Sequence, residues 1–218
     1  MMDHAARPIA PSLLLLCPLY GGMMVLAGFL GNKQADFGPL SVELGLSAYI
    51  VVLAISSVVA ELHGRRLANL LAIAGFLPLL ASMALIALGL ALPPSQHMSA
   101  ERIAAFDIVF AQSPRIMVAG IAAYLVSVLL NVRIFSWLRG RLARGGWWLM
   151  FSGGVAAGLA QIVDGLIFVC IAFYGVFPIL PLLAGQVIAK VILSFTAVPL
   201  LIRFGVGIGR RFDREAKR

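Results

Sequence analysis

The sequence carries little charge. Only 12% of its 218 residues are Asp, Glu, Lys or Arg, whereas a soluble domain has about 25%. Hydrophobic residues make up 61% of the chain, so there are too few charged side chains to cover the apolar surface in water. This composition excludes a water-soluble globular domain, a disordered chain and a collagen-like or disulfide scaffold. It indicates an integral membrane protein.

Several chemical motifs are missing as well. There is no Walker A lysine loop for ATP and no HExxH pair for a metal ion, and the three histidines are scattered along the chain. We find no Ser/His/Asp set at one membrane depth. The basic residues form short clusters, not a basic face interleaved with aromatics. We therefore expect no enzyme activity, no cofactor, no metal and no nucleic acid partner.

Cysteine is also scarce. Cys17 and Cys170 are the only two, and each lies within an apolar run without CxxC spacing. We predict that both are free thiols buried inside the protein, where a thiol behaves as a small hydrophobic group. They therefore give no information about the redox compartment.

Long apolar runs make up most of the remaining sequence. A helix needs about 20 apolar residues to cross a hydrocarbon core of about 30 Å. We therefore predict an all-α integral membrane protein, a six-transmembrane-helix bundle that occupies residues 9–205. Pro18 and the pair Gly21-Gly22 predict a first helix that is kinked or unwound. The six predicted spans are residues 9–30, 39–62, 67–92, 114–138, 147–175 and 178–203.

The basic residues predict the orientation of these spans. Thirteen Lys and Arg residues lie at one set of span ends, three lie at the other, and Lys190 lies inside the last span. With an even number of crossings, both termini are predicted to be cytoplasmic. Residues 1–8 would form a cytoplasmic N-terminus and residues 206–218 a basic cytoplasmic tail. The segment 93–113 predicts a short amphipathic helix at the opposite surface.

Ionisable and amide side chains inside the spans are the candidate functional residues. A charge at mid-membrane is unfavourable by at least a few kcal/mol and usually faces a partner or a cavity. Gln161, Asp164 and Phe168 lie on one side of the fifth span because they are three and four residues apart. Gln186 and Lys190 are four apart in the sixth span. Asp164 and Lys190 lie at similar depths, so we expect a buried pair.

This pair has two interpretations from the residues alone. Asp164 and Lys190 could form only a clamp between two helices. They could instead line a polar cavity, with charges that compensate each other until a ligand binds. Glu61 could bind the ligand or be an interfacial residue paired with nearby arginines. Glu43 could simply be solvated at the outer end of its span.

The chain resembles the queuosine precursor transporters, also called the vitamin uptake transporter family. The most specific match is the stretch from Gln161 to Asp164, which continues through Phe168 to Gly175. The resemblance runs over residues 33–199, most of the chain. The other matching positions are Glu61-Leu62-His63-Gly64, Pro114-Arg115, Phe135, Trp147-Trp148, Lys190 and Pro199.

The resemblance implies uptake of 7-deazaguanine bases, which are salvaged to make queuosine in transfer RNA, across the bacterial inner membrane. The sequence departs from the family pattern at Ser57 and Asn131, where aspartates are usual, at Gly165, where a small hydroxyl residue is frequent, and at Gly28, where asparagine is common. The candidate substrate-binding residues are Asp164, Gln161, Lys190, Glu61, Arg115, Phe168, Gln186 and Asn131.

These residue types suit a guanine-like base. A carboxylate can accept hydrogen bonds from the adjacent ring N–H and amino group, and an amide can donate to the ring carbonyl. An aromatic ring such as that of Phe168 can stack on the base. We expect Asp164 or Glu61 to accept from the base, and Lys190 and Arg115 to balance the charge.

Other functions fit the same size and helix number. The chain could be the substrate-binding subunit of a multi-component vitamin importer that requires an external ATPase module. It could also be an intramembrane enzyme with Glu61 and His63 as acid and base, or a purely structural membrane protein. The expected partners are a nucleobase-like small molecule, the lipid bilayer and a second copy of the chain. Gly154 and Gly158 form a small-xxx-small pair that suits a homodimer contact or an internal one.

Overall fold

The structure, a computed structural model, describes residues 10–30, 33–37, 40–111, 114–142, 145–175 and 179–216. The predicted N-terminal segment 1–8 lies outside these residues. Within them the chain forms eight helices and one two-stranded sheet. The elements are α1 (Pro11–Leu30), β1 (Gln34–Phe37), β2 (Leu40–Glu43), α2 (Gly45–His63), α3 (Arg65–Ala74), α4 (Phe76–Ala91), α5 (Ala100–Phe110), α6 (Pro114–Arg141), α7 (Gly146–Phe173) and α8 (Ile179–Glu215).

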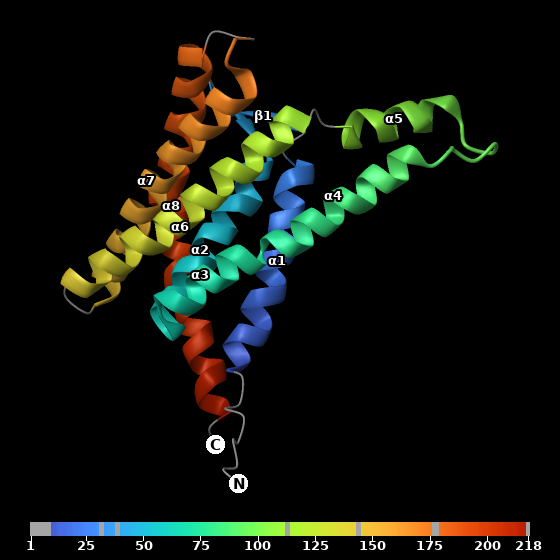
Figure 1. Cartoon of the computed structure of the whole chain (residues 1–218). Helices are drawn as coiled ribbons and strands as arrows, with labels where there is room; N and C mark the ends of the chain where they lie inside the picture. The colour runs from blue at the N-terminus through green and yellow to red at the C-terminus, as the bar shows by residue number, and fades with distance from the viewer. Residues whose placement is uncertain are drawn as a thin grey trace.

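Six of the described helical segments are long and apolar enough to cross a membrane, which confirms the predicted fold class. α1, α2, α6, α7 and α8 each contribute one span, and α3 and α4 together contribute the remaining one. α1 begins and α8 ends at the same end of the bundle, as an even number of crossings requires (Figure 1). The chain is therefore a multi-pass membrane protein.

α2 is the central helix. It packs against α1, α3, α6 and α8, and 72% of its membrane-spanning window is buried. The corresponding value for the span formed by α3 and α4 is 22%, and α4 lies at the edge of the bundle (Figure 1). The side chains of α4 that face outward are apolar because lipid, and not water, is their solvent. Polar groups that must be shielded from lipid therefore gather around α2.

The third span is broken, although the sequence predicted one helix over 67–92. α3 and α4 meet at Gly75. Pro78 has no N–H to donate to the carbonyl of Ala74, and its ring crowds that carbonyl, so the helix is interrupted one turn before it. A Cβ at Gly75 would overlap the ring of Tyr20. Glycine therefore lets α1 approach the break closely.

The second span also begins differently from its prediction. β1 pairs antiparallel with β2, with Gln34 opposite Glu43, and α2 begins at Gly45 rather than at residue 39. The apolar residues of β2 fit a strand as well as a helix. Pairing with β1 decides between them, because it satisfies backbone groups that a helix would otherwise satisfy internally.

Two further predictions about the first and last spans are corrected. α1 runs without interruption through Pro18 and the Gly21-Gly22 pair, so it is not unwound there. α8 continues to Glu215, well past the predicted end at residue 203. At about 1.5 Å per residue, α8 is about 55 Å long, so its C-terminal turns extend beyond a hydrocarbon core. The predicted basic tail is thus helical over 206–215.

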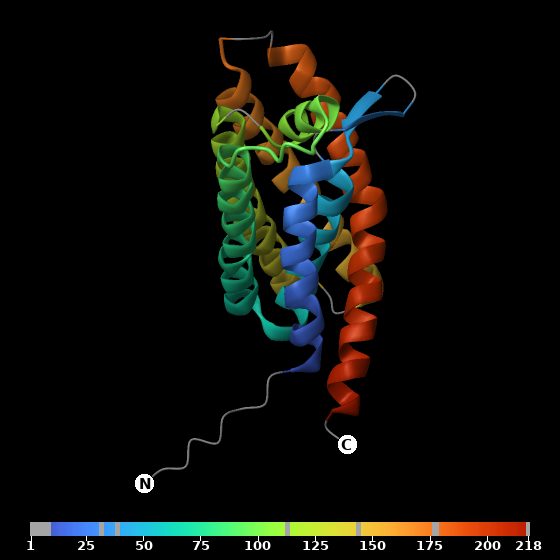
Figure 2. The ribbon, with the colours of Figure 1, turned by 90° about the vertical axis from the view of Figure 1, so that its right-hand side faces the viewer.

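The predicted short helix in the segment 93–113 is present as α5. Ser99 caps it by accepting a hydrogen bond from the backbone N–H of Arg102 at 3.4 Å. α5 lies at the end of the bundle opposite the termini (Figures 1 and 2). None of its residues is buried.

The prediction of buried cysteines is wrong. Cys17 and Cys170 are free, as expected, but both are exposed on the outside of the bundle. In a membrane protein an apolar run can face lipid as readily as the protein interior. Apolar neighbours in the sequence therefore do not show that a thiol is enclosed.

α7 and α8 approach each other closely at glycines. A Cβ at Gly154 would lie 3.2 Å from Cδ1 of Phe195, and a Cβ at Gly158 would lie 2.7 Å from Cε2 of the same ring. The small-xxx-small pair therefore serves a contact within the protomer. The homodimer stays a prediction that no longer rests on this face.

Candidate functional site

The predicted contact between α7 and α8 is present. Nζ of Lys190 donates to Oδ2 of Asp164 at 3.0 Å. Both residues are buried, with 7% and 8% of their surfaces exposed. A pair in such an environment compensates two charges that would each be unfavourable alone, and removing one partner leaves the other without compensation.

Two hydroxyl groups complete the environment of Asp164. Its Oδ1 lies 3.1 Å from Oγ of Ser127 on α6 and 3.4 Å from the hydroxyl of Tyr49 on α2. Tyr49 and Ser127 also hydrogen-bond to each other. Because each hydroxyl has one proton, one of them donates to Oδ1 when the other donates to its neighbour. Four helices therefore meet at one carboxylate, which is bonded by a charged ammonium and by a hydroxyl pair.

An amide lies one turn along α7 from this carboxylate. Gln161 is fully buried, and neither its Nε2 nor its Oε1 has a hydrogen-bond partner among the described residues. A buried amide that lacks partners is unfavourable by about 1–3 kcal/mol in proteins. Native structures rarely retain such a group without a reason, and a ligand or a water molecule would supply the missing partners.

Asn131 on α6 is a second incompletely bonded amide. Its Nδ2 donates to Oγ of Ser56 at 2.9 Å and to Oγ of Ser57 at 3.2 Å, and its Oδ1 has no partner among the described residues. Asn131 is one turn from Ser127 on α6, just as Gln161 is one turn from Asp164 on α7. Because α6 and α7 are antiparallel neighbours, the two amides lie at about the same depth. The two departures from the family pattern, Ser57 and Asn131, thus contact each other.

A tyrosine pair that was not predicted from the sequence extends the polar centre toward α1. The hydroxyls of Tyr20 and Tyr124 are 2.5 Å apart, and Tyr124 also donates to the carbonyl of Ala72 at 3.4 Å, close to the break at Gly75. The ring of Tyr124 packs edge-on against that of Tyr49, with centroids 6.1 Å apart. Tyrosines fit apolar spans, so sequence alone gave no signal of their pairing.

Glu61 is not part of this centre. Its carboxylate receives two hydrogen bonds of 2.9 Å from Arg139 on α6 and one of 3.4 Å from Arg210 on α8. The interfacial interpretation of Glu61 thus fits its contacts, but with these partners and not with the adjacent Arg65 and Arg66. Glu61 is about 18 Å along α2 from Tyr49, at about 1.5 Å per residue.

The structure corrects the expectation that no Ser/His/Asp set forms. Oγ of Ser12 lies 2.7 Å from Nε2 of His63 and donates to Oδ2 of Asp213 at 2.9 Å. The set escaped prediction because Asp213 lies on the unpredicted extension of α8. It lacks the order of a catalytic triad, in which the serine contacts only the histidine. Here the serine bridges the other two, and its backbone N–H also donates to Asp213 at 3.0 Å.

Four predicted site residues have not yet been placed. Phe168 is half-buried on α7, one turn beyond Asp164. Glu43 lies in β2. Arg115 begins α6 and Gln186 lies one turn before Lys190 on α8, but the side chains of Glu43, Arg115 and Gln186 lie outside the described part of the structure.

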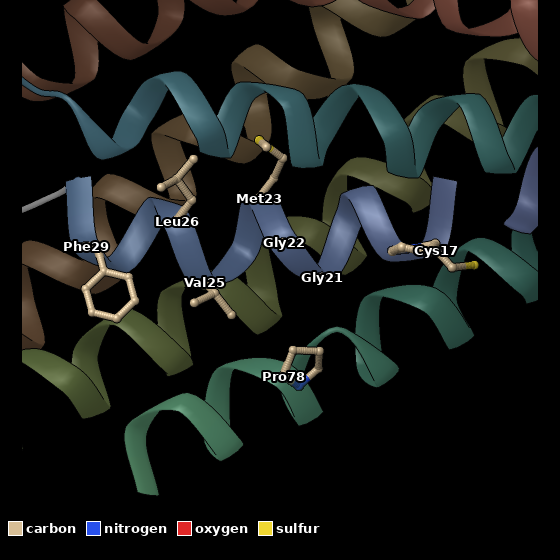
Figure 3. A pocket seen from close by; sticks show the side chains of 9 residues that line it. Cys17, Gly21, Gly22, Met23, Val25, Leu26, Phe29 and Pro78 are labelled. Carbon is tan, nitrogen blue, oxygen red and sulfur yellow. The ribbon is translucent and has the colours of Figure 1, made fainter. Parts of the chain in front are cut away.

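Two hollows occur elsewhere on the described surface. An open apolar groove of about 630 Å³ lies between α1 and α4 and is lined by Gly21, Phe29 and Pro78 among others (Figure 3). A smaller one of about 440 Å³ lies along α8 near Arg203 and Arg211. Neither is lined by Asp164 or Lys190, so a cavity around the buried pair stays a prediction.

The spans and the charged centre define a multi-pass membrane protein with polar groups from several helices gathered inside it, the arrangement typical of a small-molecule transporter. Residues 43–204 match the family described as "Putative vitamin uptake transporter". The match covers most of the chain, so the chain belongs to the vitamin uptake transporter family. No curated protein and no solved structure matches it. Family membership indicates a transporter of a small molecule.

Proposed function

We propose that the protein takes up queuosine precursors, the 7-deazaguanine bases, across the bacterial inner membrane, with both termini in the cytoplasm. The observation that carries this proposal is the buried amide of Gln161, one turn from the Asp164–Lys190 pair, which has no hydrogen-bond partner among the described residues. A base offers donors and acceptors on one edge, which is what an amide and a carboxylate side by side can recognise.

In this proposal the carboxylate of Asp164 accepts from the ring N–H and amino group of the base, while Gln161 pairs with the ring carbonyl. Lys190 holds Asp164 until the ligand arrives and then continues to balance its charge. Phe168, one turn further along α7, supplies an aromatic face, and such stacking contributes about 1–3 kcal/mol per base in related settings. Asn131, on the facing turn of α6, offers a carbonyl oxygen that has no partner in the described part of the chain. The proposal leaves Glu61 outside the binding site, because it lies about 18 Å along α2 from Tyr49, at about 1.5 Å per residue.

The test is uptake of a radiolabelled 7-deazaguanine by cells without their own carrier. We expect competition by unlabelled 7-deazaguanines and weak or no competition by guanine and vitamins. Asp164→Asn should reduce uptake at least tenfold, since a neutral amide presents both a donor and an acceptor where the base needs two acceptors. Asp107→Asn, the same change on the exposed helix α5, is the matched control and should leave uptake unchanged. Wild-type uptake by a normally inserted Asp164→Asn protein would contradict the proposed site.

The same experiment in proteoliposomes separates this proposal from the importer subunit that requires an external ATPase module. The purified chain alone should move the substrate down its gradient without ATP. Saturable binding without any movement would favour the subunit, and the absence of both would exclude this substrate.

A further inference from the structure

The end of the bundle that carries both termini is tied together by two neighbouring polar clusters. In the first, Glu61 of α2 binds Arg139 of α6 and Arg210 of α8. In the second, His63 of α2 contacts Ser12 of α1, which donates to Asp213 of α8. We name the two clusters together the terminal latch. They join four helices, α1, α2, α6 and α8, across the last turn of α2.

The latch lies on the route that a ligand would take from the buried pair. α2, α6 and α8 each contribute to the centre around Asp164, through Tyr49, Ser127 and Lys190. The latch joins these same three helices about 18 Å further along α2, at about 1.5 Å per residue. A ligand that leaves Asp164 toward the termini must therefore pass helices that the latch holds together.

At the same end of the bundle, two glycines of α8 allow close packing against side chains of α2. A Cβ at Gly209 of α8 would lie 2.5 Å from Cδ1 of Leu62, and one at Gly205 would lie 2.8 Å from Cγ2 of Val58. α8 thus lies directly on α2 while the latch is closed. No passage can open there unless α8 moves away from α2, and that movement requires the contacts of Glu61 and Ser12 to break.

The bonding in the latch is directional and can be exchanged for water. Glu61 and Arg139 each keep 13% of their side-chain surface exposed, so solvent reaches both groups when they separate. Because the hydroxyl of Ser12 gives its single proton to Asp213, it must accept from Nε2 of His63. Each group therefore has a defined partner in this structure.

From these contacts we infer that the terminal latch is the gate of the transport pathway at the cytoplasmic end, closed in this structure, and that Glu61 and Ser12 are gating residues. This inference rests on the proposed transport function but not on the identity of the substrate. It gives Glu61 a role that differs from ligand binding.

The test measures access to the interior without any substrate. Ser57, fully buried one turn inside Glu61, is replaced by cysteine in a chain with Cys17→Ser and Cys170→Ser. A membrane-impermeant maleimide is then added to vesicles from the side of the termini. We expect Glu61→Gln and Ser12→Ala each to raise the labelling rate at least tenfold. The charge exchange Glu61→Arg with Arg139→Glu should restore slow labelling.

Arg211→Gln is the matched control, because Arg211 is paired only with Glu215 on the exposed side of α8 at 3.6 Å among its described contacts. It should leave the labelling rate unchanged. Equal rates in the parent, Glu61→Gln and Ser12→Ala proteins would overturn the gate. Should Glu61→Gln not fold, Ser12→Ala and the charge exchange still decide. Faster labelling without uptake of 7-deazaguanines would support the gate and reject the substrate. Unchanged labelling with normal uptake would reject the gate and support the substrate.

Discussion

The carboxylates of Asp164 and Glu61 are paired in different ways. Asp164 binds Lys190 through a single contact of 3.0 Å, and its second oxygen binds two hydroxyls. Glu61 binds Arg139 through two parallel hydrogen bonds of 2.9 Å, and Arg210 adds a third contact. In the first arrangement a ligand has to replace only one hydrogen bond between the two charged groups. In the second, a planar guanidinium binds the carboxylate through two parallel hydrogen bonds, and a second arginine also contacts it.

The difference between a lysine partner and an arginine partner suits the two carboxylates to different roles. A single ammonium on a flexible stem can move aside for a ligand without losing its charge from the site. A forked guanidinium fixes the geometry of its carboxylate and favours one helix arrangement. In the proposed transport function the centre of the protein exchanges a contact of Asp164 for a ligand, and in the inferred gate the end near the termini holds the helices together until the gate opens.

The largest effect should follow Lys190→Met. This change leaves the carboxylate of Asp164 without a cation in a buried site, which should lower stability by about 3–5 kcal/mol and abolish uptake. Arg139→Met should lower stability by only about 1–3 kcal/mol, because Arg210 still binds Glu61. Thermal unfolding in detergent compares the two. Adding Asp164→Asn to Lys190→Met should recover most of the stability but none of the uptake. Equal losses of stability in Lys190→Met and Arg139→Met would contradict the difference between the two carboxylates.

A smaller effect on stability, with a large one on uptake, is expected for Gln161→Leu. Leucine removes two buried polar atoms that have no described partners, so stability should stay within about 1 kcal/mol of the parent or rise. Uptake should fall at least tenfold because the base loses its amide. Asn131→Leu is the comparison, since it breaks bonds to Ser56 and Ser57 and should destabilise by about 1–3 kcal/mol. A loss of stability in Gln161→Leu as large as that would mean that Gln161 is a structural group.

The smallest effect is expected at the outer edge of the latch. Arg210 has 56% of its side chain exposed, so Arg210→Gln should change stability by no more than about 0.5 kcal/mol. In thermal unfolding, Arg210→Gln should be about as stable as Arg211→Gln. A loss of stability close to that of Arg139→Met would show that Arg210 contributes as much to binding Glu61 as Arg139 does. The contrast between the two arginines would then be weaker.

Much of the architecture could be predicted from the sequence. Each predicted span contains a helix, and the short helix before α6 lies in the predicted segment. The errors concern where the helices begin and end. Pro78 interrupts the third span one turn before itself, and α2 begins at Gly45 because the residues before it pair with β1 as a strand. Hydropathy alone does not register either effect.

The candidate site divides in the same way. The residues of α7 and α8 could be predicted to meet, because helical spacing and depth placed Asp164 and Lys190 together. Tyr49 and Ser127 could not, since hydroxyl side chains are common in spans and carry no charge that must be compensated. Ser12 and Asp213 lie at opposite ends of the chain, and their contact depends on how far α8 extends.

The sequence by itself determined the solvent of this protein, the number of its crossings and the presence of charges that must find partners in the interior. Those are properties of composition and helical period, which each segment carries alone. Only the tertiary structure decided which helix faces those charges, which amide groups lack partners among the described residues and which residues tie the helices near the termini. Such choices depend on the rotation and depth of whole helices, and these are set by packing between residues far apart in the chain.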